Sequence, residues 1–151
     1  MTTTLQPYRG SPLIPPFPRA SVADVMRPGL LSSHADAPIT EVADTMATYR
    51  IHAVAVAGIR TDAVHGEELV WGLISDLDLA RAAGGNLEGR VAADFARTEA
   101  VTVEATTPLR EAASMMAEHG TSHLIVARDG RPIGMVSGLD VAAAIAWGGG
   151  G

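Results

Sequence analysis

Apolar residues recur with helical spacing in two segments that lie 70 residues apart in the chain. The first segment has apolar residues at positions i, i+3, i+4, i+7 and i+8: Ile39, Val42, Ala43, Met46 and Ala47. The second segment repeats the pattern with Leu109, Ala112, Ala113, Met116 and Ala117. This spacing puts the apolar residues on one face, so it predicts one amphipathic helix in each segment. Pro38 and Pro108 stand where these helices begin, a position that proline favours.

Short apolar runs follow each predicted helix, and Asp129-Gly130 is a hairpin signal between two of them. The predicted strands cover residues 53–57 and 69–74 in the first copy, and residues 124–127 and 133–136 in the second. A second helix then begins at Ser75 or at Ser137. We expect a short strand before each first helix, around 30–32 and 101–103, and a lead-in helix before that strand, at 22–26 and 91–96. Each copy therefore reads β-α-β-β-α, an α/β (α+β) unit.

The two copies form an internal repeat. A shift of 70 residues places Asp24 on Asp94 and Met46 on Met116, and a shift of 62 places Gly72 on Gly134. The first copy thus holds eight extra residues between its two central strands, and we expect them to form a longer hairpin loop. The repeat predicts a first module at 21–83, a linker at 84–90 and a second module at 91–147. One copy alone is too small to bury a secure core, so we expect the two to pack together.

The two ends of the chain differ from the repeat in composition. Five prolines lie within residues 1–20, and this density predicts an extended, disordered arm, with a recognition tail as the alternative. Residues 148–151 form a glycine tail that we expect to be frayed.

Composition narrows the function classes. The chain has 151 residues, 47% of them hydrophobic and 19% charged, which is enough apolar material for a packed core. A net charge of −6 without a basic cluster argues against nucleic-acid binding. The chain has no cysteine, which excludes disulfides and thiolate catalysis and is compatible with the cytoplasm, where we expect the protein. We find no signal peptide and no membrane span, because the apolar runs are too short.

A Gly-x-x-Ser-x-x-Asp turn ends each copy, as Gly72…Ser75…Asp78 and as Gly134…Ser137…Asp140. At the start of a helix, free backbone N–H groups and a serine hydroxyl favour a phosphate. A carboxylate one turn later suits the paired hydroxyls of a ribose. Ser-x-x-Asp is also a variant of the capping box, in which both side chains bind the backbone of the helix start. Repetition at equivalent positions favours binding, and one residue can fill both roles.

The chain resembles a tandem pair of CBS domains, the modules named after cystathionine β-synthase, over about residues 21–147. The matching segments are Val22 to Pro28, Val42 to Met46, Arg50 to Val56 and the two turns. The resemblance implies two modules packed about a pseudo-twofold axis, with two clefts that bind AMP, ADP, ATP, S-adenosylmethionine or NAD. It also implies a homodimer and no enzymatic activity.

The resemblance assigns roles to particular residues. Asp78 and Asp140 would hold ribose, and Ser75 and Ser137 would approach phosphate. The base would be lined by Leu31, Ser32, His52 and Ala53 in the first copy, and by Val101, Thr102, Ser122 and His123 in the second. Arg50 and His52 add positive charge to the first copy, whereas the second offers only His119 and His123. We therefore expect unequal clefts and favour a monophosphate or a nucleoside-like ligand over a triphosphate.

Three functions compete at this point. The first is a regulatory module that senses an adenosine-type ligand and acts through an unknown protein target or an oligomer. The second is a ligand-free structural dimer in which the serines and aspartates only cap helices. The third, an enzyme, is the least favoured, because no nucleophile with an activating base and no P-loop occurs. The five histidines do not form a metal motif: His119 and His123 have helical spacing, but Gly120 between them predicts a helix end.

Overall fold

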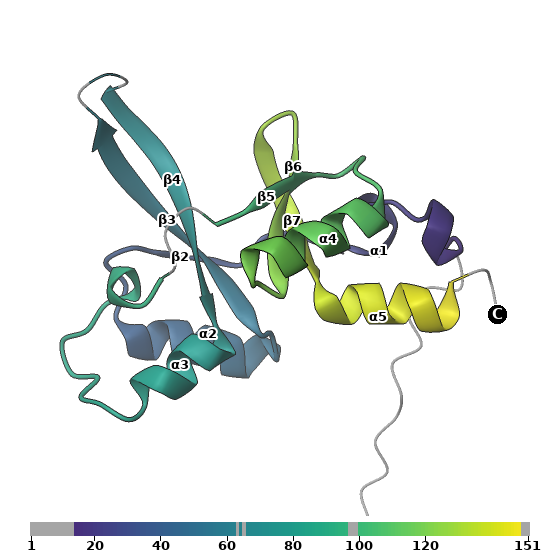
Figure 1. Ribbon diagram of the computed structural model, residues 1–151. Coiled ribbons are helices and arrows are strands. Elements are labelled where there is room, and N and C mark those ends of the chain that lie inside the picture. Colours follow the sequence, from purple (N-terminus) through teal and green to yellow (C-terminus); the bar gives the residue numbers. More distant parts are fainter. Residues whose placement is uncertain (1–13, 63, 65, 97–99, 149–151) are drawn as a thin grey trace, which may run out of the picture. The chain divides into compact units, whose positions relative to one another are not determined.

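The computed structural model describes residues 14–62, 64, 66–96 and 100–148 (Figure 1). The chain forms two compact units. Unit 1 contains the described residues up to Pro28 together with those from Thr102 onward, and unit 2 is Gly29–Val101. The chain passes from one unit to the other twice, after residue 28 and after residue 101. Each unit is described by itself below.

Unit 2 is a three-stranded sheet with helices. Its elements are β2 (Ser32–His34), α2 (Ile39–Tyr49), β3 (Ala53–Asp62), β4 (Gly66–Ser75), α3 (Asp76–Ala82) and the 3-10 helix η2 (Ala92–Asp94). The strand order is β2-β3-β4. β2 is parallel to β3, and β3 and β4 form the long antiparallel hairpin drawn in teal in Figure 1. A parallel pair needs a crossover connection, and α2 supplies it.

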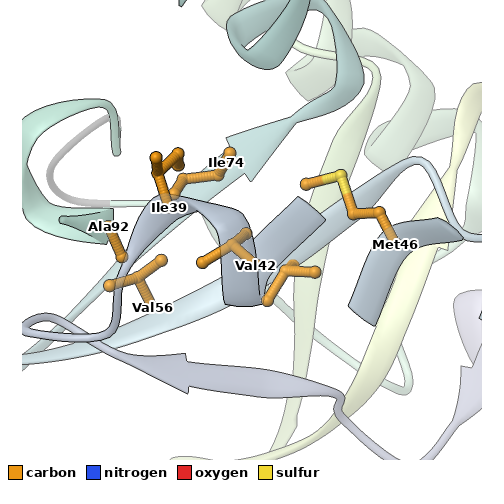
Figure 2. Close-up of a cluster of buried hydrophobic side chains, with 7 residues drawn as sticks. Ile39, Val42, Met46, Val56, Ile74 and Ala92 are labelled. Carbon is orange, nitrogen blue, oxygen red and sulfur yellow. The ribbon is translucent and has the colours of Figure 1, made fainter. Parts of the chain in front are cut away.

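The apolar stripe of α2 builds the core of unit 2. Figure 2 shows Ile39, Val42 and Met46 gathered with Val56 and Ile74 of the hairpin. Val54 and Ala92 complete this buried cluster. Val54 and Ile74 are directly paired across the hairpin and both are 0% exposed. Full burial of such a side chain contributes roughly 1.5–3 kcal/mol, so this cluster is the main source of stability in the unit.

Unit 1 is a four-stranded sheet with helices. Its elements are η1 (Phe17–Arg19), α1 (Val22–Val25), β1 (Arg27–Pro28), β5 (Thr102–Glu104), α4 (Leu109–His119), β6 (His123–Arg128), β7 (Arg131–Ser137) and α5 (Gly138–Trp147). The strand order is β1-β7-β6-β5, with β5 parallel to β6 and the other pairs antiparallel. Leu109, Ala112 and Met116 form the buried stripe of α4, as expected.

The lead-in segment of each sequence copy binds the body of the other copy. In unit 1, the backbone N–H groups of Val22 and Ala23 donate to the carbonyl oxygens of Thr107 and Ala105, at 2.9 Å each. In unit 2, the N–H groups of Ala92 and Ala93 donate to Ala37 and Ala35, at 2.8 and 2.9 Å. These residues correspond under the 70-residue shift. The repeat is therefore reciprocal: each lead-in segment completes the unit that holds the other copy's sheet.

The α/β class and the order β-α-β-β-α of each copy are confirmed. Three local expectations are corrected. The extra residues of the first copy do not form a longer loop but lengthen both strands, which pair from Ala53↔Ser75 as far as Asp62↔Gly66. The second lead-in segment is one turn of 3-10 helix.

The third correction concerns the expected disordered arm. Residues 14–20 are packed in unit 1, with Ile14 and Ala20 buried, because Ala20 accepts a hydrogen bond from the N–H of Leu109 at 2.8 Å. Residues 1–13 and 149–151 of the expected tails lie outside the described residues. No helix in the described part of the chain has the length and apolar character needed to span a bilayer.

Candidate functional site

The two Ser-x-x-Asp turns are fully formed capping boxes at the starts of α3 and α5. The N–H of Ser75 donates to Asp78 Oδ2 at 2.8 Å, and the Ser75 hydroxyl donates to the same oxygen at 3.0 Å. The N–H of Asp78 in turn donates to Ser75 Oγ at 3.3 Å. Ser137 and Asp140 make the same three bonds at the same distances. The capping interpretation of the motif is therefore correct for both copies.

The capping bonds limit how the turns can meet a ligand. A carboxylate has about four lone-pair sites, and the cap uses two of them on one oxygen. The serine hydroxyl already donates its hydrogen to the carboxylate. A phosphate at the serine must therefore bind backbone N–H groups of the helix start, or the hydroxyl must rotate away from the aspartate. The aspartate keeps acceptor capacity on its second oxygen, which a ribose hydroxyl can use.

Strand register brings several of the expected residues to one face of each sheet. Residues directly opposite each other point to the same face, and the side-chain period along a strand is two. In unit 2, Ser32 pairs with Ala55, and Ala53 pairs with Ser75. Ser32, Ala53 and Ser75 therefore share the face opposite Val54 and Ile74 of the core.

Unit 1 has the same arrangement. Thr102 pairs with Ile125, and His123 pairs with Ser137, so Thr102, His123 and Ser137 share one face. The core residues Leu124 and Val136 pair with each other on the opposite face, and both are 0% exposed. Val101 belongs to unit 2 and Thr102 to unit 1, so these two expected neighbours are divided between the units.

The remaining expected residues of unit 2 lie at strand and helix ends. Leu31 is exposed and its carbonyl oxygen accepts from the N–H of Ala55 at 3.2 Å. Arg50 ends α2 in the left-handed conformation, at φ 54°. His52 Nδ1 lies 2.8 Å from Asp76 Oδ2, and both side chains are exposed. Asp76, the first residue of α3, was not among the residues expected from the sequence.

The corresponding position in unit 1 has no such pair. The backbone contact is kept: the N–H of Gly138 donates to the carbonyl oxygen of Ser122 at 2.9 Å, as Asp76 does to His52 at 2.8 Å. The side chains differ, because Ser122 Oγ instead makes a 3.0 Å hydrogen bond with His123 Nδ1. The expectation of unequal surroundings for the two turns thus has a structural basis in the His52–Asp76 pair.

Electrostatics also mark the turn of unit 1. Burial raises the pKa of Asp140 above its ordinary value, against the opposing effects of the Ser137 hydrogen bonds and of the positive charge of Arg27. Arg27 was missed by the sequence reasoning, although the 70-residue shift that defines the repeat places it on a second arginine, Arg97, which lies outside the described residues.

Two further expectations from the sequence concern residues outside the turns. Asp24 and Asp94 cap or brace, as expected: their Oδ2 atoms accept from the N–H groups of Ser21 and Val91 at 2.8 and 2.9 Å. α4 ends at His119, and Gly120 follows in the left-handed conformation, so His119 and His123 do not share a helix. Among the described residues, no three histidine or acidic side chains gather as metal ligands.

Comparison with known proteins addresses the fold and the family. None of the curated proteins compared with the chain matches it in sequence. The crystal structure of CBSX2 in complex with AMP is 21% identical, with a TM-score of 0.65, and covers 82% of this chain and 94% of that one. The CBS domain pair of protein MJ0100, in complex with 5′-methylthioadenosine and S-adenosyl-L-methionine, is 22% identical, with a TM-score of 0.68, and covers 83% and 94%. Hypoxic Response Protein I, with two coordinated zinc ions, is 24% identical, with a TM-score of 0.63, and covers 82% and 97%.

These likenesses show a shared fold over nearly the whole length of the compared chains. The family model of the CBS domain matches the sequence twice, over residues 22–85 and 91–146. The two matches contain both Ser-x-x-Asp turns and both lead-in segments. The chain therefore belongs to the CBS domain family and carries two CBS domains in tandem.

Proposed function

We propose that this chain is a regulatory module that senses an adenosine-type ligand and does not transform it. The observation that carries the proposal is the repeated turn: in both units a serine and an aspartate stand at the end of a strand, beside a sheet face that bears further polar residues. The complexes of CBSX2 with AMP and of MJ0100 with adenosyl ligands support the ligand class.

In this proposal Asp78 and Asp140 hold the ribose, and Ser75 and Ser137 lie next to phosphate. Leu31, Ser32 and Ala53 line the base in unit 2, with Arg50 and His52 supplying positive charge. Val101, Thr102, Ser122 and His123 have the corresponding role for the second turn. Binding changes the affinity of the chain for a second copy in a homodimer, or for a protein target in the cytoplasm, by as much as the ligand distinguishes two states.

Calorimetry with AMP, ADP, ATP, S-adenosylmethionine and NAD tests the proposal. We expect at least one ligand to bind below millimolar concentration and its binding to weaken in Asp78→Ala or Asp140→Ala. Asp24→Ala is the matched control, because Asp24 makes the same bond to a serine N–H at 2.8 Å but lies outside the turns. The proposal is wrong if no ligand binds, or if Asp24→Ala weakens binding as much as the turn variants do.

The alternative, a ligand-free structural dimer, is favoured by one observation: both capping boxes are complete. It predicts that all three substitutions lower the free energy of unfolding by about 1 kcal/mol, with no ligand titration to be affected. Thermal unfolding of the three variants, measured with and without the ligands, separates the two functions. A ligand that raises the melting temperature of the wild-type chain but not of Asp78→Ala with Asp140→Ala contradicts the alternative.

A further inference from the structure

One row of directly paired residues crosses the whole sheet of unit 1. Arg27 of β1 pairs with Met135 of β7, Met135 pairs with Ile125 of β6, and Ile125 pairs with Thr102 of β5. Because directly opposite residues point to the same face, all four side chains lie on one face. This is the face that also bears His123 and Ser137. Arg27 thus stands at the edge of the face on which the expected site residues of unit 1 lie.

Arg27 is also a diagonal neighbour of the turn. Its partner Met135 lies two residues before Ser137 on β7. Diagonal neighbours of this kind are about 7–8 Å apart between Cα atoms, within the reach of a long side chain. The side chain of Arg27 is exposed, and its charge acts on Asp140 in the first turn of α5. The two other arginines on strands of unit 1, Arg128 and Arg131, pair with each other at the opposite end of β6 and β7.

We propose that Arg27 binds the phosphate of a nucleotide held at the Ser137–Asp140 turn, so that the ligand of unit 1 is a nucleoside phosphate. This inference rests on the proposed function. The guanidinium group matches a phosphate with two parallel hydrogen bonds and stays charged at every relevant pH. A phosphate at this turn approaches the Asp140 carboxylate, and a nearby arginine offsets their repulsion.

The proposal changes the earlier picture of the second copy as poor in basic groups. The missing charge comes from the first copy, because the lead-in segment of that copy is a strand of unit 1. A residue that is 110 positions away from Ser137 in the sequence is thereby placed beside it. Arg27 discriminates by charge: it favours AMP over adenosine, which has the same base and ribose but no phosphate.

The test compares AMP with adenosine in calorimetric titrations of the full chain. Asp78→Ala is included in every protein, so that binding at the unit 2 turn does not obscure the result. We expect Arg27→Met to weaken AMP binding about 10- to 100-fold, the usual effect of losing a charge-assisted hydrogen bond, and to leave adenosine binding unchanged. Arg27→Lys should restore part of the AMP affinity. Arg131→Met is the matched control, since it removes an exposed arginine from the same strand about 20 Å from Ser137.

The outcomes separate this inference from the proposed function. If AMP binds the Asp78→Ala protein equally well with and without Arg27→Met, the phosphate role is wrong while the proposed function stands. If Arg27→Met weakens AMP and adenosine by the same factor, Arg27 acts on the ribose through Asp140 and the phosphate role is again wrong. If neither compound nor any other adenosyl ligand binds the wild-type chain, the proposed function itself fails. Thermal unfolding of each variant checks that the fold is kept.

Discussion

At the scale of single residues, four aspartates share one structural task. Asp24, Asp78, Asp94 and Asp140 each stand three residues after the first residue of a capping box and accept from its backbone N–H at 2.8 or 2.9 Å. Their surroundings differ, however. Hydrogen bonding to Val91 lowers the pKa of the exposed Asp94, with Arg90 adding to the effect, whereas burial raises the pKa of Asp140.

These opposite shifts predict opposite pH dependence of stability. The folded chain holds the proton of Asp140 more tightly than the unfolded chain does, so this residue's contribution to stability falls as pH rises from its ordinary pKa of 3.8 through the raised value. The contribution of Asp94 is present above 3.8 and is lost as pH falls through its lowered value. We expect urea titrations from about pH 3 to 6 to show it: wild type should lose stability relative to Asp140→Asn with rising pH, and gain stability relative to Asp94→Asn. Slopes of the same sign would contradict this.

Arg50 gives a second prediction at this scale. It adopts φ 54°, where the other copy has Gly120 at φ 60°. A side chain in the left-handed region costs about 1–2 kcal/mol, part of which glycine loses again through the freedom of the unfolded chain. Arg50→Gly should therefore raise the free energy of unfolding by roughly 0.5–1 kcal/mol in denaturant titrations, and Gly120→Arg should lower it. If Arg50→Gly destabilises the protein, the side chain makes contacts that outweigh its backbone strain.

At the scale of elements, the pairing of β1 with β7 explains a glycine of the repeated turn. Gly134 pairs with Pro28, and a Cβ atom at Gly134 would clash with the carbonyl oxygen of Arg27 and lie 3.3 Å from the Cα of Pro28. The backbone of β1 thus approaches β7 where only glycine leaves room. In sequence terms Gly134 belongs to the candidate binding motif, yet its structural reason is strand packing.

Substitution of this glycine tests the close approach. Gly134→Ala should lower the free energy of unfolding by about 1–3 kcal/mol, the usual cost of overpacking, as measured by chemical denaturation. Gly138→Ala is the control, because its Cβ would meet Ser122 only at the ordinary distance of 3.9 Å. Equal stability of the two variants would show that β1 moves away from β7 without cost.

Most of the elements could be predicted from the sequence, because the helical stripes of α2 and α4 and the Ser75 and Ser137 starts are local signals. The lengths of β3 and β4 could not, since a strand extension and a long loop have similar local patterns. The site followed the same division. Ser75, Asp78, Ser137 and Asp140 are visible in the motif, whereas Arg27 and Asp76 depend on pairing partners that no local pattern specifies.

At the scale of the whole molecule, the sequence repeat and the compact unit are different divisions of the chain. The repeat divides near residues 84–90, whereas the compact units divide after residues 28 and 101. Unit 2 is one continuous segment that contains its own η2, whose N–H groups bind Ala35 and Ala37. Unit 1 is built from two segments that unit 2 separates.

This division predicts which fragment folds. A fragment of residues 29–101 keeps η2 and Ala92, which belongs to the buried cluster with Ile39 and Val42. A fragment of residues 21–83, the first sequence copy, lacks them. We expect cooperative thermal unfolding, followed by circular dichroism, for 29–101 and none for 21–83. A cooperative transition in 21–83 alone would show that the lead-in segment of its own copy can replace η2.

The reciprocal lead-in segments also have a consequence for the newly made chain. Arg27 and its partner Met135 are 108 residues apart in the sequence, so β1 has no strand to pair with until almost the whole protein has been synthesised. At the usual rate of about 5–20 residues per second, this delay lasts roughly 5–20 s. Unit 2 is complete long before then. The N-terminal segment therefore waits on the ribosome, unpaired, while the middle of the chain folds.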